Sequence, residues 1–167
     1  MALRANLSVA LAFALCAAGA TATPSSRPLL QQNVSLALAN ELAEAALAAC
    51  HADGRSAVVA IVDRGGNLVA VQRDDSVGPH NTDAARQKAF TALSTKSATR
   101  ELATNARATP DAQNLNTVPS LLLIGGGVPL KVGKDVIGAI GVGGSGGAAN
   151  DEGCALKAIA KVLPNSN

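Results

Sequence analysis

Two histidines and three cysteines are the side chains of this chain best suited to ligate a metal or to react. None of the cysteines stands in a C-x-x-C pair, the spacing typical of zinc sites and thioredoxin-like motifs. Cys16 lies in the N-terminal segment, which leaves Cys50 and Cys154 for the folded part. Both lie on apolar faces of predicted helices, so we expect a disulfide between them in an oxidising compartment, with two separate buried thiols as the alternative.

The two histidines have different sequence surroundings. His51 shares a polar stripe with Glu41 and Glu44 on a predicted helix, which indicates an exposed surface residue. His80 follows a Gly-Pro dipeptide, whose proline restricts the backbone, and stands at the start of a second predicted helix. His80 is therefore either a capping or packing residue or a candidate ligand.

A glycine-rich segment from Gly141 to Gly147 precedes the last predicted helix. It matches G-x-G-x-x-G, but too few residues follow the helix for the second parallel strand of a dinucleotide fold. Ser145, in the same segment, lacks the chain order typical of a hydrolase nucleophile. The backbone N–H groups of this segment would suit an anion, and a simple flexible connection is the alternative.

The N-terminus has the three-part layout of a secretory signal. A single Arg4 is followed by the apolar run 7–18 and by small residues up to Ala22. The run is about 12 residues long, whereas a membrane-spanning helix needs about 20. We therefore predict a signal peptide at 1–22, a polar tether at 23–33 and a periplasmic or secreted protein without stable membrane insertion.

The composition narrows the possible partners. The formal net charge is only +2, and neither basic runs nor interleaved aromatic residues occur, so we expect no nucleic-acid partner. Hydrophobic residues make up 48% of the chain, yet Trp and Tyr are absent, and Phe90 is the one aromatic residue beyond the signal. The core must therefore consist of small aliphatic side chains.

Hydrophobic periodicity predicts a single α/β domain at 34–167. We expect helices at about 35–52, 81–97, 99–106 and 150–163, and strands at 56–63, 68–73, 120–124, 128–132 and 135–142. Tight turns at 64–67, 125–127 and 133–134 require antiparallel neighbours. The expected fold is an α/β sandwich with one mostly antiparallel sheet of five strands.

Several stretches together resemble the GlcG/HbpS-like family, whose domain is also fused to PduO-type corrinoid adenosyltransferases. They are AVVAIVDRGGNLVAVQRDDSVGPH (57–80), AARQKAFTALS (84–94), TREL (99–102) and PSLLLIGGGVPLKVGKDVIGAIGVGGSGGAANDEGCA (119–155). The resemblance implies a profilin-like five-stranded fold, haem binding and assembly into homo-oligomers, but no settled catalytic activity. One departure is at 141–147, where family members commonly carry a G-V-S-G-A-P-G-G type segment.

Given the haem binding that the resemblance implies, we expect His80 rather than His51 to ligate the iron. Glutamates near His51 would repel the haem propionates, whereas Arg73, Arg86 and Lys88 flank His80 in sequence and would pair with them. The partial positive charge at the start of a helix would also stabilise the propionates near His80. With so few aromatic residues, we expect a shallow site at the surface or between subunits.

The function expected from the sequence is haem capture, storage or sensing by an exported homo-oligomer. An alanine-rich face within 84–92 of the second helix would allow close contact between copies. Two alternatives stay open: an enzyme acting on a hydroxy acid in glycolate metabolism, and an assembly module without a ligand.

Overall fold

The computed structural model describes residues 26–163, and the predicted signal peptide lies outside them. The chain divides into two units, Met1–Leu30 and Gln31–Asn167, and all helices and strands of the described residues belong to the second. Within the described residues, no helix is both long enough and apolar enough to cross a membrane.

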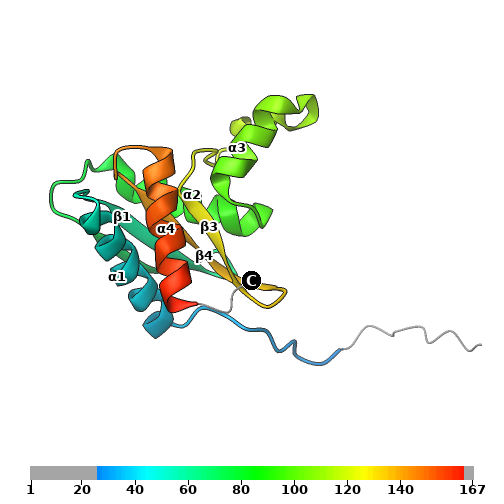
Figure 1. Cartoon of the computed structure of the whole chain (residues 1–167). Coiled ribbons are helices and arrows are strands. Elements are labelled where there is room, and N and C mark those ends of the chain that lie inside the picture. Colours follow the sequence, from blue (N-terminus) through cyan, green and yellow to red (C-terminus); the bar gives the residue numbers. More distant parts are fainter. Residues whose placement is uncertain (1–25, 164–167) are drawn as a thin grey trace, which may run out of the picture. The chain divides into compact units, whose positions relative to one another are not determined.

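The second unit alternates helices and strands along the chain (Figure 1). Four α-helices, one 3-10 helix and four strands follow in the order α1 (Leu36–Ala52), β1 (Val58–Asp63), β2 (Leu68–Arg73), α2 (His80–Thr95), α3 (Thr99–Ala108), η1 (Pro110–Thr117), β3 (Gly127–Val132), β4 (Asp135–Gly143) and α4 (Ala148–Val162). The predicted helices and four of the five predicted strands are therefore confirmed, with boundaries shifted by a few residues.

The four strands form one antiparallel sheet in the order β2-β1-β4-β3. The central strand β1 is apolar from Val58 to Val62, and all five of these residues are completely buried. The turn of the hairpin between β1 and β2 is held by the carboxylate of Asp63. This carboxylate accepts hydrogen bonds from the N–H groups of Gly65 and Asn67, at 2.8 and 2.9 Å.

Helices cover both faces of the sheet. Figure 1 shows α1 and α4 side by side over one face and α2 behind the other. Side chains alternate along β1, as the pleat requires: Val59 and Ile61 join the core under α1 and α4, whereas Ala60 and Val62 pack against alanines of α2. The close approach of α2 depends on Gly141 of β4, where a Cβ atom would lie 2.0 Å from the Ala85 carbonyl oxygen.

The expectation of a fifth strand at 120–124 is wrong. The backbone of this segment bonds to helix side chains instead of a strand: the Leu122 N–H donates to Thr91 Oγ1 at 2.8 Å, and Thr99 Oγ1 donates to the Ile124 carbonyl at 2.8 Å. The glycines at 125–127 therefore lead into β3 without closing a hairpin. The sheet has four strands, and the finer comparison with profilin is not confirmed.

Candidate functional site

His80 is the first residue of α2, and its side chain is exposed. Among the described residues, no hydrogen bond or ion pair reaches its ring. The preceding Gly78 leaves room for the imidazole, since a Cβ atom there would lie 3.2 Å from His80 Cε1. Both ring nitrogens are thus free to bind an external partner.

His51 differs from His80 in this respect. It is exposed, as predicted, but its Nε2 lies 2.9 Å from Asp74 Oδ2. Asp74 also accepts the Ala57 N–H at 2.8 Å. Burial by itself would raise the pKa of Asp74, but the hydrogen bonds from Ala57 and His51, with the His51 charge, lower it overall. One ring nitrogen of His51 is therefore already engaged.

Two of the expected cations lie at the surface near His80 in sequence. Arg73 donates from Nη2 to the neutral Val77 carbonyl, and within residues 26–163 no acidic side chain forms an ion pair with it. The Arg86 guanidinium lies 2.9 Å from Asp83 Oδ1, and its hydrogen bonds, with one from Gln87, lower the pKa of Asp83. Arg73 is therefore the more available partner for an anion.

Lys88 does not join these cations, which corrects the expectation from sequence. Its side chain is buried, and its Nζ lies 2.7 Å from Asp151 Oδ2 and 3.0 Å from the Val142 carbonyl oxygen. The cause is helical periodicity, because Lys88 shares the sheet-facing side of α2 with Ala85, Ala89 and Ala92. A propionate at the surface would not reach it.

The glycine-rich loop before α4 is held from within the chain. Asp151, in the first turn of α4, accepts both the N–H and the hydroxyl of Ser145 through Oδ1, at 2.9 and 2.5 Å. Lys88, Ser145 and Asp151 are all buried. The anion at this loop is therefore the chain's own carboxylate, and the Ser145 N–H is not open to an external ligand.

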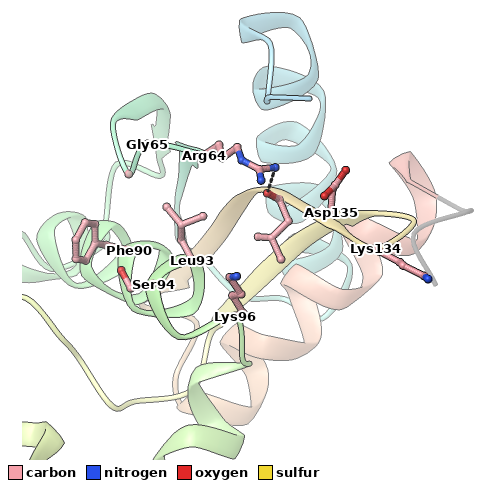
Figure 2. Close-up of a pocket in the computed structure, with 10 residues that line it drawn as sticks. Arg64, Gly65, Phe90, Leu93, Ser94, Lys96, Lys134 and Asp135 are labelled. Carbon is pink, nitrogen blue, oxygen red and sulfur yellow. Dashed lines mark hydrogen bonds between the residues drawn. The ribbon is translucent and has the colours of Figure 1, made fainter. Parts of the chain in front are cut away.

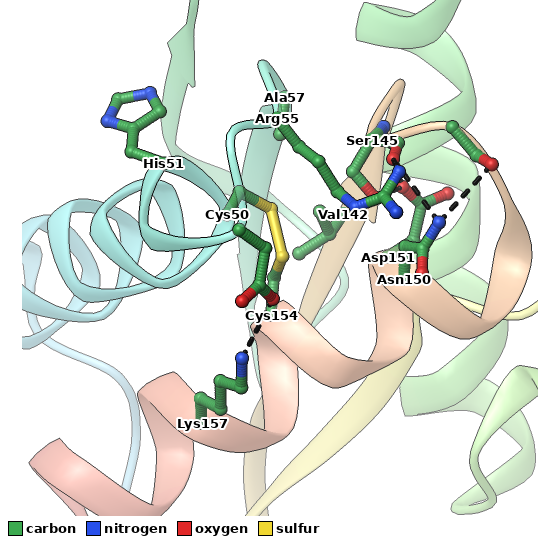
Figure 3. The surroundings of a disulfide bond; sticks show 12 residues. Cys50, His51, Arg55, Ala57, Val142, Ser145, Asn150, Asp151, Cys154 and Lys157 are labelled. Carbon is green, nitrogen blue, oxygen red and sulfur yellow. Dashed lines mark hydrogen bonds and ion pairs between the residues drawn. A yellow bond between two sulfur atoms is a disulfide. The ribbon is translucent and has the colours of Figure 1, made fainter.

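The predicted disulfide is present between Cys50 of α1 and Cys154 of α4 (Figure 3). The two Cα atoms lie 5.4 Å apart, and the sequence separation is 104 residues. Both cysteines belong to the core cluster, whereas the neighbouring His51 points away from the bond. The disulfide therefore joins two neighbouring helices in the core.

The edge strand β2 carries an exposed apolar strip that the sequence did not predict. Leu68 and Val71 are 49% and 37% exposed. They pair with Val62 and Ala60 of β1, which pack against α2, so their side chains lie on the α2 side of the sheet. Arg73 follows on the same side. Because α2 packs mainly on β1, β3 and β4, it leaves this strip of β2 uncovered.

A cavity of about 360 Å³ lies at the other end of α2 (Figure 2). Its walls come from the β1–β2 turn, the end of α2 and the β3–β4 turn, and include Arg64, Phe90, Leu93, Ser94, Lys96, Lys134, Asp135 and Val136. The sequence singled out Phe90 as a lone ring but not the cations around it, because those come from three segments far apart in the chain.

The sequence and the fold are similar to those of known proteins. The family model described as "Haem degrading protein HbpS-like" matches residues 34–160, nearly the whole folded unit. The chain belongs to the HbpS-like family. This confirms the resemblance found in the sequence and covers the elements from α1 to α4.

Solved structures and curated relatives agree with the HbpS-like assignment. A crystal structure of an HbpS double mutant from Streptomyces reticuli has a TM-score of 0.76 at 34% identity, over 87% of this chain and 97% of that one. A PduOC:haem complex has a TM-score of 0.68 at 28% identity, over 77% and 94%. Protein GlcG of Escherichia coli is 33% identical over 63% of this chain and 80% of its own length.

Proposed function

We propose that this HbpS-like chain is an exported haem-binding protein that captures, stores or senses haem. The observation that carries the proposal is the match over 34–160 to a family described as haem-degrading. A similar chain that was crystallised as a haem complex adds to it. Export to the periplasm or the exterior rests on the signal-like sequence of residues 1–22, and the Cys50–Cys154 disulfide suits an oxidising compartment.

The described residues fit a haem at the start of α2. A haem needs a ligand for its iron, an apolar surface for its ring and partners for its propionates. His80 supplies an imidazole without a competing partner, and imidazole is a common haem ligand. His51 fits less well, because binding iron through Nε2 would first break its contact with Asp74.

The ring and propionates would use neighbouring parts of the same face. Val71, two residues before Arg73 on the same side of β2, offers an exposed apolar side chain, which burial under a flat ring would stabilise. The guanidinium of Arg73, which bonds to a neutral carbonyl, would pair with a propionate, and Arg86 would do so in competition with Asp83. Lys88 has no part in this proposal. Bound haem would supply a redox-active iron, while these residues hold it and leave it open to exchange.

A haemin titration of the chain from Thr23 onward tests the proposal. We expect a Soret band that shifts, and an affinity that falls by about tenfold or more, in His80→Ala, because an iron ligand is lost. His51→Ala is the matched control and should bind like the parent. A response to His51→Ala and not to His80→Ala would overturn the ligand assignment, and no haemin binding by the parent chain would overturn the function.

We also propose that the chain assembles into homo-oligomers, although not through the alanine face of α2. Ala85, Ala89 and Ala92 are buried against the chain's own sheet and cannot meet a second copy. The segment from α3 through η1 is a better candidate, since it extends away from the sheet (Figure 1) and no residue of η1 is buried. Val118 and Ile124 near it are 40% and 49% exposed. Light scattering that gives only a monomer at micromolar concentration would refute this.

A further inference from the structure

The cavity at the end of α2 has an apolar wall whose position is fixed by the hairpin. Phe90 and Leu93 line it, and Phe90 is the one Phe, Tyr or Trp among the described residues. Gly66 of the β1–β2 turn has φ +83°, and a Cβ atom there would lie 2.9 Å from Phe90 Cε2. The glycine therefore allows the turn to pack directly on the ring. This turn and the ring meet at the edge of the cavity.

The remaining walls carry an excess of positive charge. The lining includes three cationic residues, Arg64, Lys96 and Lys134, and one acidic residue, Asp135. Arg64 is oriented by a hydrogen bond from Nη1 to the Val136 carbonyl at 3.1 Å, while Lys134 lies at the outer edge (Figure 2). Among the described residues, neither lysine ammonium has a hydrogen-bond acceptor or an ion-pair partner. The end of α2 adds only about half a negative charge, so the cavity stays cationic.

Lys96 occupies an unusual backbone conformation at this cavity. Its φ of 54° makes it the one residue other than glycine with a positive φ in the described part of the chain. It caps α2 in the left-handed region, a position that glycine favours because a Cβ atom there is strained. A long cationic side chain is thus kept where glycine would be more stable, and it lines the cavity. Backbone strain of this kind is a feature of binding sites.

We propose that this cavity binds a small aromatic carboxylate, a ligand distinct from haem. The ring would lie on Phe90 and Leu93, and the carboxylate would pair with Lys96 and Arg64. The volume of about 360 Å³ lies near the lower end for small-ligand sites, about 300–1,000 Å³. No His, Cys or Met lines the cavity, so it offers no usual iron ligand. The cavity residues from Phe90 to Lys96 follow His80 by 10 to 16 residues, which places them about 15–24 Å along the helix from it.

The probe for this site is 2-naphthoate, titrated into the chain from Thr23 onward and followed by its own fluorescence. The protein has no Trp or Tyr to interfere. We expect saturable binding of 2-naphthoate and at least about tenfold weaker binding of the neutral 2-naphthamide, because the charge-assisted contacts are lost. Equal binding of the two compounds would overturn the assignment of a carboxylate.

Lys96→Gly is the decisive variant, because it removes the cation and relieves the backbone strain together. We expect a thermal midpoint equal to or above that of the parent, and 2-naphthoate binding weaker by about three- to tenfold. Unfolding therefore cannot explain the loss. Lys161→Gln, which removes one charge from an exposed position of α4, is the control and should bind like the parent. Unchanged binding by Lys96→Gly would overturn the proposal.

The edge of a porphyrin presents the same chemistry, a carboxylate beside a flat ring. Repeating the 2-naphthoate titration in the presence of saturating haemin separates the two sources. We expect the affinity for 2-naphthoate to be unchanged, because the proposed haem site lies at the other end of α2. Displacement by haemin would overturn the claim of a separate site, whereas the His80 titration tests haem binding independently.

Discussion

Removal of the Cys50–Cys154 disulfide should greatly destabilise the folded unit. The bond closes a loop of 104 residues, so it restricts the unfolded chain strongly. The chain-entropy model gives about 4.7 kcal/mol at 25 °C for a loop of this length, and measured values are commonly somewhat lower. For a domain of this size, the loss corresponds to a fall of roughly 10–20 °C in the thermal midpoint.

The comparison that isolates this effect is between the oxidised and the reduced parent chain. Cys50 is completely buried and Cys154 is 2% exposed, so reduction requires unfolding with a reductant before refolding. The reduced thiols remain apolar side chains in the same helix interface, so packing changes little. Urea unfolding followed by far-UV circular dichroism then measures the contribution of the cross-link.

A Cys50→Ala/Cys154→Ala variant serves as the second measurement. It should match the reduced parent chain and lose slightly more stability, because two buried sulfur atoms are removed. The reasoning would be refuted if the oxidised chain and both uncross-linked forms unfolded within about 1 kcal/mol of each other. Mass spectrometry that finds two free thiols in protein isolated without reductant would refute the bond itself.

Three further predictions concern the buried network, the acid limb of stability and the close approach of α2. Lys88→Met should lower the free energy of unfolding by about 3–5 kcal/mol, because it leaves the buried carboxylate of Asp151 without its cation. The control Lys157→Met removes one partner of an exposed ion pair and should change the free energy of unfolding little in the same denaturation assay. Because the folded-state pKa of Asp74 is lowered, its contribution to stability is complete above its ordinary value of 3.8 and is lost as the pH falls through the folded value. Asp74→Asn should therefore flatten the loss of stability between about pH 5 and pH 2, and an unchanged acid limb in thermal melts would contradict this. Gly141→Ala should cost about 3 kcal/mol or more, since its Cβ atom would overlap the α2 backbone. Gly153→Ala in α4, with open space around it, should instead be neutral or stabilising by up to about 1 kcal/mol, and equal effects of the two changes would argue against the packing.

Local patterns were enough to predict most elements of the fold. The apolar run of β1, the Gly-Gly turn after it and the helix that ends near Asp53-Gly54 are encoded by neighbouring residues, so their positions follow from the sequence. The segment 120–124 has a similar apolar pattern but forms no strand. Its backbone partners, Thr91 and Thr99, lie in helices that only the tertiary structure brings alongside it.

The same distinction applies to the candidate sites. The sequence by itself determined the family and His80 as the histidine at the start of a helix, because each depends on residue type and local order. It left the Cys50–Cys154 disulfide open against two separate thiols, because the pairing depends on α1 lying beside α4. It did not separate Lys88 from Arg73 and Arg86, because burial depends on which helix side meets the sheet. Only the tertiary structure paired Lys88 with Asp151, engaged His51 with Asp74 and brought Arg64, Lys96 and Lys134 around Phe90. Ion pairs and cavities join residues far apart in the chain, and local sequence patterns carry no record of those distances.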